Sequence, residues 1–297
     1  MPLLSRRSIL ALAAVFASVG FAAAQSAPDT TAKKKPLGFL TDTVKKYGLV
    51  PQHFTIAIGG YVPSVSSSVQ LNSPTLTGDN IDLENRLGLN HNTQSLDVQA
   101  TMRLGQKQLI TLGYFGFKRS ADKTISDSIT FGDTTYHAGA QLATNSSIQY
   151  YGFTYRYYFV RKPSWELGAG LGIDALVLSA GLKLAVDGGG GAGSSVQHSG
   201  GFTAPAPMIG IYGDWEFVPR FYFRGQLQYL YINNIASFGG HVTDDKLAIE
   251  WFPLHNYGLG VGYHYIDLNI NKDLRDGGNL DINYNIQGVM FYLSAAF

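Results

Sequence analysis

The chain has 297 residues, with 22 Lys and Arg against 21 Asp and Glu, and only 14% of its residues are charged. A nearly neutral chain has no electrostatic attraction for nucleic acid, which is therefore excluded as a partner. The absence of cysteine excludes disulfide frameworks, thiol nucleophiles and Cys-ligated zinc.

The N-terminal residues predict an export signal. Arg6 and Arg7 precede an apolar run from Ile9 to Ala23, and alanines occupy positions 22–24. This order of charged, apolar and small-residue regions is typical of a secretory signal peptide. We predict a signal peptide over residues 1–24, with cleavage near Ala24. Removing its two arginines from the 22 basic residues leaves 20 against 21 acidic ones, a net charge of about −1.

Residues 25–52 are predicted to form a periplasmic N-terminal linker. Leu37, Phe39 and Leu40 have loosely helical spacing, so a short helix against a barrel mouth is the alternative. Beyond the signal, the sequence has no uninterrupted apolar stretch of the roughly 20 residues that a membrane helix requires.

Ten segments then alternate apolar with small or polar residues. In the ninth, Leu259, Val261 and Tyr263 alternate with Gly260 and Gly262. Successive side chains of a strand point to opposite faces, so each segment predicts a strand with one apolar face. The segments are 54–62, 95–104, 109–114, 151–159, 166–177, 208–217, 221–231, 246–251, 257–266 and 289–297.

The connectors between these segments alternate in length. Short links are predicted at 105–107, 161–163, 218–220 and 253–255, and long polar links at 72–94, 119–147, 186–200 and 272–280. The link near 236–240 is a short exception. Short periplasmic turns and long extracellular loops are typical of outer-membrane barrels. We predict an all-β fold, a transmembrane antiparallel up-and-down β-barrel over residues 53–297. It has about ten strands, with eight or twelve as alternatives.

Two motifs resemble those of known families. The C-terminal segment Phe291–Phe297 is similar to the aromatic signal that the barrel-assembly machinery recognises, with Phe291, Leu293 and Phe297 as its assembly residues. The chain thereby resembles the small OmpA/OmpW-like outer-membrane barrels of Gram-negative bacteria. Residues 80–90 resemble the I-D-L-E-x-x-L-G-L segment of a family of uncharacterised outer-membrane proteins. The resemblance implies an outer-membrane location, with lipid, lipopolysaccharide and the assembly machinery as partners.

Charged residues on the inward parity predict an ionic network in the lumen near the short turns. They are Arg103, Arg156, Glu166, Asp214, Glu216, Arg224 and Glu250. Charges removed from water must be paired, and Arg suits bidentate pairing with carboxylates. The favoured interpretation is a packed polar core that closes a narrow barrel. A gate for small solutes and catalysis by the carboxylates are the alternatives.

Other candidate chemistry is weaker. The sequence contains no His-x-Ser pair, the pattern that would indicate an outer-membrane lipase. Asp79, Asp82 and Glu84 lack the spacing of a calcium loop. His241 with Asp244 and Asp245 could form an omptin-like protease site at the outer rim.

The inward-facing His264 is interpreted as a core residue rather than a ligand. We therefore expect a non-enzymatic, structural or loop-presenting barrel without cofactor or metal. A narrow channel and an outer-membrane hydrolase are the alternatives. The sequence leaves the oligomeric state open.

Overall fold

The computed structural model describes residues 53–185, 196–235, 238–274 and 277–297. The predicted signal peptide at 1–24 and the linker at 25–52 lie outside these residues. Within them, no helix is long and apolar enough to cross a membrane.

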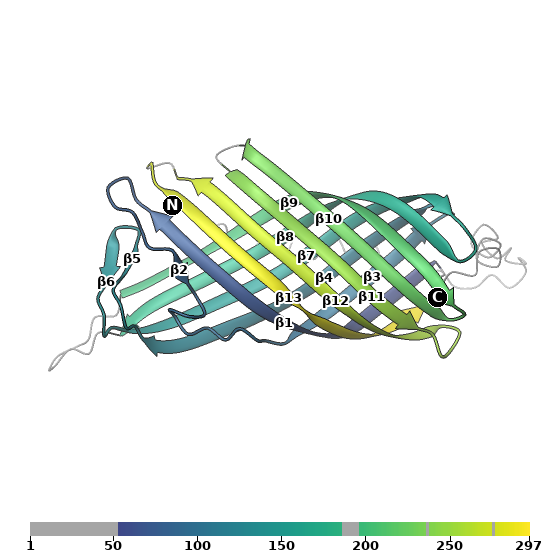
Figure 1. Cartoon of the computed structure of the whole chain (residues 1–297), viewed down its shortest axis with the longest axis horizontal. Helices are drawn as coiled ribbons and strands as arrows, with labels where there is room; N and C mark the ends of the chain where they lie inside the picture. The colour runs from purple at the N-terminus through teal and green to yellow at the C-terminus, as the bar shows by residue number, and fades with distance from the viewer. Residues whose placement is uncertain (1–52, 186–195, 236–237, 275–276) are drawn as a thin grey trace, which may run out of the picture. The chain divides into compact units, whose positions relative to one another are not determined.

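Ten antiparallel strands form a closed barrel, which confirms the predicted fold class (Figure 1). Each strand pairs with its neighbour along the chain, and the last strand pairs with the first, as in Ile58 opposite Leu293. The strands are β1 (Phe54–Asn72), β3 (Ser95–Leu104), β4 (Gln108–Thr124), β7 (Gln141–Arg161), β8 (Trp165–Ala185), β9 (Val196–Val218), β10 (Phe221–Ile235), β11 (Phe238–Trp251), β12 (Tyr257–Asp273) and β13 (Asn279–Ala296).

The two ends of the barrel differ in their connections. At the short-turn end, residues 105–107, 162–164, 219–220 and 252–256 join the strands. The long-loop end carries residues 73–94 and 125–140. These loops contain β2 (Ile81–Asp82), which pairs with β1, and the hairpin of β5 (Ile129–Phe131) and β6 (Thr134–Tyr136). Arg220 has φ 70° in its two-residue turn, a backbone conformation that residues other than glycine rarely adopt.

Most strands are longer than the sequence predicted, and the added residues lie at the long-loop end. The ninth segment was predicted over 257–266, whereas β12 continues to Asp273. Val261 and Tyr263 are each 43% exposed on its outer face, but Ile266 and Leu268 are buried inside. The apolar residues therefore change from the outer to the inner face part-way along the strand.

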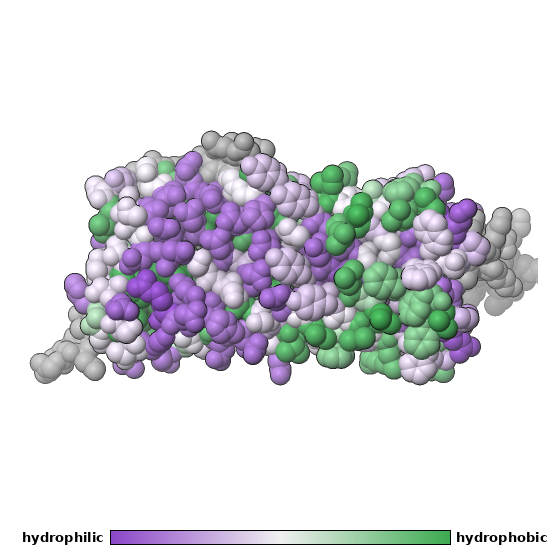
Figure 2. Space-filling view, in the orientation of Figure 1, coloured by the Kyte–Doolittle hydropathy of each residue, from purple (hydrophilic) through white to green (hydrophobic). Residues whose placement is uncertain are grey.

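The outer face of the short-turn half is an apolar belt. Figure 2 shows the hydrophobic colours gathered over this half and hydrophilic colours over the other. Members of the belt that are at least half exposed include Leu96, Phe159, Leu171, Ile173, Ile209, Ile211, Trp215, Tyr257, Phe291, Leu293 and Phe297. Such a band with aromatic borders is typical of transmembrane barrels.

The wall has an irregular seam at the long-loop end, between β1 and β4. β3 joins these two strands, but its pairing with β4 stops at Leu96 opposite Gly116. Beyond this point the loop segment 81–93 fills the gap. It bonds to β1 through Leu83 N to Ser67 O (3.0 Å), and side chains of β4 donate to its backbone carbonyls, Arg119 to Asn90 O and Lys123 to Asn85 O.

Candidate functional site

The short-turn half of the lumen contains buried ion pairs. Arg103 of β3 donates to Glu166 of β8 at 2.5 Å, and Arg161 of β7 donates to the other oxygen of Glu166 at 2.8 Å. All three side chains are at least 92% buried. Two guanidinium groups on one carboxylate form the strong, charge-assisted type of hydrogen bond that can compensate desolvation.

A second group of ions lies across β9, β10 and β11. Arg224 donates to Asp214 at 3.1 Å and to Glu250 at 2.6 Å. The Tyr158 hydroxyl donates to the second oxygen of Asp214 at 2.8 Å. Strand register brings these residues together, because Arg224 stands opposite Asp214 on β9 and opposite Ala248 on β11, two residues from Glu250 on the same face.

Two of the predicted network residues have other partners. Arg156 donates to the Gln226 amide oxygen at 2.8 Å and lies 4.1 Å from the Tyr212 ring centroid, a cation–π distance. Glu216 accepts from the Tyr222 hydroxyl at 3.1 Å. The structure thus places the seven predicted residues in separate groups. It adds Arg161, which the sequence assigned to a turn.

A small cavity of about 100 Å³ lies among these groups. Asp97, Arg156, Arg224, Lys246, Glu250 and Tyr292 are among its lining residues. The lumen is narrow here because aromatic rings occupy it. A Cβ atom on Gly260 would stand 2.1 Å from the Tyr292 ring, which explains a glycine on the inner face.

A polar and aromatic layer lies on the long-loop side of the cavity. His264 Nε2 is 3.1 Å from Asp244 Oδ1, and the Tyr150 hydroxyl donates to Asp244 Oδ2 at 2.7 Å. The rings of Tyr61 and Phe115 pack against His264, with centroids 5.4 and 5.6 Å away. His264 is fully buried, and its bond to Asp244 places it in the packed interior.

The structure separates two of the three residues of the protease-site alternative at the outer rim. Asp244 is fully buried in the lumen. His241 lies on the opposite face of β11, and its Nε2 is 3.0 Å from Asp267 Oδ2. His241 and Asp244 are three positions apart on one strand, so they point to opposite faces, whereas Asp245 shares the outer face with His241.

The long-loop half of the lumen is filled by a hydrophobic core. Strand residues such as Phe117, Ile148 and Ile286 pack there with Leu87 and Ile129 of the two long loops, all buried. We call residues 73–94 and 125–140 the loop cap. The loops of the cap join each other, because Thr130 N donates to the Asp79 carboxylate at 2.7 Å.

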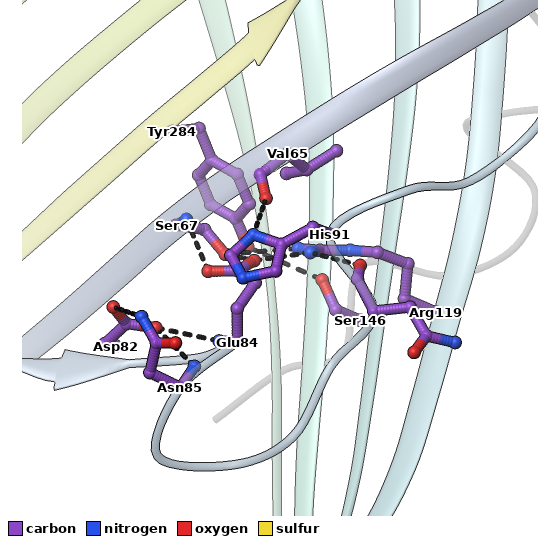
Figure 3. A network of polar contacts seen from close by, with 10 residues as sticks. Val65, Ser67, Asp82, Glu84, Asn85, His91, Arg119, Ser146 and Tyr284 are labelled. Atoms are coloured by element: carbon purple, nitrogen blue, oxygen red, sulfur yellow. Dashed lines mark hydrogen bonds and ion pairs between the residues drawn. The ribbon is translucent and has the colours of Figure 1, made fainter.

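One buried ion pair fastens the loop cap to the wall (Figure 3). Glu84 of the cap bonds Arg119 of β4, and their side chains are 1% and 2% exposed. Ser67 of β1 donates to Glu84 through both its amide and its hydroxyl, each at 2.7 Å. A charged cap residue therefore has its partners inside the barrel wall.

Asp82 stabilises the turn that presents Glu84. Its carboxylate accepts from the amide N–H of Asn85 at 2.6 Å and that of Glu84 at 3.0 Å. Partial burial acts to raise the pKa of Asp82, but these hydrogen bonds outweigh it and hold the pKa below its ordinary value. Asp79, Asp82 and Glu84 thus have separate partners, and the described residues contain no cluster of three metal-ligating side chains.

The predicted assembly residues lie on the outer face of the belt. Phe291, Leu293 and Phe297 are 58%, 64% and 55% exposed. Recognition by the assembly machinery stays a prediction.

Comparisons with known proteins identify the fold. No protein-family model matches the chain. No curated protein matches it either. Among solved structures, the outer membrane protease OmpT from Escherichia coli superposes with TM-score 0.55 at 11% identity, covering 84% of this chain and 98% of that one. The Ail protein of Yersinia pestis gives 0.29 at 9% identity, covering 81% and 97%. The Pseudomonas putida toluene transporter TodX gives 0.35 at 7% identity, covering 89% and 94%. The chain therefore has the fold of an outer-membrane β-barrel, while the OmpA/OmpW-like group stays a prediction.

Proposed function

We propose that this protein is a closed, non-enzymatic barrel of the Gram-negative outer membrane that presents a folded loop cap to the exterior. Its short turns face the periplasm, and the apolar belt contacts lipid. Assembly by the barrel-assembly machinery follows from the same location.

The observation that carries this proposal is the hydrophobic core in the long-loop half of the lumen. Tyr61, Phe115 and Ile266 are fully buried at its base, and Leu83 and Leu89 of the loop cap are buried at its top. Close-packed apolar side chains leave no aqueous path. A solute that entered the short-turn cavity would meet this core.

The channel alternative requires the core to open. Planar-bilayer recording of the full-length protein tests it directly. We expect no unit currents from the native chain, and none when Arg156 or Arg224 is replaced by Gln. Stable unit currents from the native chain, altered by either substitution, would show that the lumen conducts and that the closed-barrel proposal is wrong.

The hydrolase alternative has a separate test. Expression in a Gram-negative host should leave the mass spectrum of lipid A unchanged, and the purified protein should not cleave peptide libraries. A lipid A mass shift or specific cleavage that is lost in His241→Ala would show enzymatic activity.

A further inference from the structure

The outer wall of β11, β12, β13 and β1 carries a regular polar surface in the long-loop half, which we call the amide face. All its members have outward parity, and in Figure 2 this wall shows hydrophilic colours. They are Ser66, Ser68, Gln70 and Asn72 of β1, Asn279, Asp281, Asn283 and Asn285 of β13, Asp267, Asn269, Asn271 and Asp273 of β12, and His241 and Thr243 of β11.

Strand register arranges these side chains in rows. Ser68 stands opposite Asn283, which stands opposite Asn269, which stands opposite His241. Neighbouring strands are about 4.8 Å apart, and side chains on one face recur at roughly 6.8 Å along a strand. The amide face is therefore a grid of short polar groups.

Hydrogen bonds within the grid hold these groups in place. Asn285 donates to Asp267 at 3.1 Å, and Asn72 donates to Asn279 at 2.6 Å. His241 bonds the other oxygen of Asp267. Ordered side chains lose less conformational entropy when a ligand binds, which favours recognition.

The chemistry of the amide face fits hydroxyl groups. Amides and hydroxyls both donate and accept hydrogen bonds, and carboxylates accept them. Lys, Arg and Glu do not occur among the fourteen members, so the face offers no lysine or arginine for a phosphate. A neutral polyol such as a saccharide meets these groups without an unpaired charge.

Two exposed tyrosines border the grid on β10. Tyr229 stands opposite Thr243 and is 50% exposed, and Tyr231 stands opposite His241 and is 64% exposed. A tyrosine presents a large apolar ring with a polar tip, which suits a sugar that has both C–H and O–H groups. The tyrosines and the grid together offer ring-stacking and hydrogen bonding side by side.

The position of the amide face selects the source of the saccharide. On the same strands it continues directly from the apolar belt, whose members nearest the long-loop end include Val261, Tyr263 and Val289. The Tyr263 hydroxyl donates to Gln287 at 2.8 Å at this border. A surface just beyond the lipid-facing belt lies at the level of the headgroups. In the outer leaflet of a Gram-negative outer membrane these headgroups are saccharides.

We propose, resting on the outer-membrane location proposed above, that the amide face with Tyr229 and Tyr231 binds the saccharide headgroups of outer-leaflet glycolipids. The sugars stack on the two tyrosines and hydrogen bond to the neighbouring amides and carboxylates. Binding depends on hydroxyl groups and not on phosphates.

The test uses the folded full-length protein in detergent and titrates it with oligosaccharide released from lipopolysaccharide, deacylated and dephosphorylated. Affinity is measured calorimetrically, and saturation-transfer NMR reports which sugar protons touch the protein. Tyr229→Ala with Tyr231→Ala removes the rings, and Asn269→Ala with Asn285→Ala removes grid amides. The matched control is Asn145→Ala with Ser147→Ala, on the outer face of β7 at the same end.

We expect each amide-face double variant to weaken binding at least tenfold and the β7 control to change it less than twofold. Heat-modifiable gel migration verifies that each variant is folded. No binding by the native protein, equal binding by all variants, or binding that requires phosphorylated oligosaccharide would overturn the proposal. So would a dimer by light scattering that only the amide-face variants dissociate, because the face would then contact a second copy. Bilayer recording of the same samples reports on the closed barrel separately.

Discussion

The two halves of this barrel place opposite chemistry on the same strands. Along β13, Phe291 and Leu293 point outward in the short-turn half, whereas Ile282 and Ile286 are buried inside in the long-loop half. β12 reverses in the same way. The change teaches that the solvent around the wall, rather than the strand, decides which face is apolar.

Each half satisfies a different solvent. In hydrocarbon the outer face must be apolar, so charged residues are confined to the lumen, where they are paired. Beyond the membrane the outer face meets water, and the lumen becomes an ordinary hydrophobic core. Arg103 with Glu166 is a pair of the first environment, and Arg119 with Glu84 is an ion pair embedded in the second.

The largest expected effect comes from breaking the ion pair in the hydrophobic core. Glu84→Ala leaves the buried Arg119 charge unpaired, which should lower the free energy of unfolding by about 3–5 kcal/mol. Urea unfolding in detergent, followed by tryptophan fluorescence, measures it. The control Asp122→Ala, on the exposed outer face of β4, should stay within about 0.5 kcal/mol. Equal stability of both variants would mean that the loop cap is not anchored through this pair.

A charge placed on the outer wall tests where the apolar belt ends along one strand. Leu171→Arg puts a cation on the belt, at a position now 67% exposed, and should cost about 2–4 kcal/mol in a bilayer. Ser179→Arg has the same parity on β8 beyond the belt and should cost less than about 0.5 kcal/mol. Unfolding in lipid vesicles gives both values. Similar costs at both positions would contradict a boundary between them.

A smaller effect distinguishes core from lipid contact on β12. Ile266→Val removes one methylene from a fully buried side chain and should cost about 0.5–1.5 kcal/mol. Val261→Ile adds the same group on the belt, where lipid adapts to it, and should change stability by less than about 0.5 kcal/mol. The same vesicle assay compares them, and a larger effect at Val261 would reverse the assignment of the two faces.

The smallest expected effect concerns the turn in the loop cap. The pKa of Asp82 lies below its ordinary value of 3.8, so its ionised form stabilises the fold above that pH. This contribution is lost as the pH falls through the folded pKa. NMR titration of the carboxyl carbon should give a midpoint below 3.8, which moves upward in Asn85→Ala. A midpoint above 3.8 in the native chain would contradict the hydrogen bonding at this turn.

The sequence predicts the half of the fold in which apolar residues face outward. Period-two alternation located all ten strands there, including 95–104, which agrees with β3. The predicted loop 119–147 contains the end of β4 and the start of β7, because the apolar parity reverses near Phe115 and Tyr150 and the alternation is lost.

The contacts inside the barrel were harder to predict from the sequence. Parity identifies which charges enter the lumen, but partner choice depends on register and on neighbours around the barrel, as with Arg156 and Gln226. Glu84 and Arg119 lie in segments that the sequence predicts as long polar links. The signal that could have found the core was the apolar spacing of Ile81, Leu83, Leu87 and Leu89, which exposed loops do not need.

The seam between β1 and β4 has a mechanical consequence. Pairing between β9 and β10 also stops early, at Tyr229 opposite Ile209. At the seam between β1 and β4, by contrast, the closure uses the irregular segment 81–93 and side chains such as Lys123, which donates to Asn85 O at 2.5 Å. Lifting of the segment should therefore let the amide hydrogens of β1 and β4 that face it exchange with solvent as one cooperative unit, while those bonded to β13 and β7 stay protected.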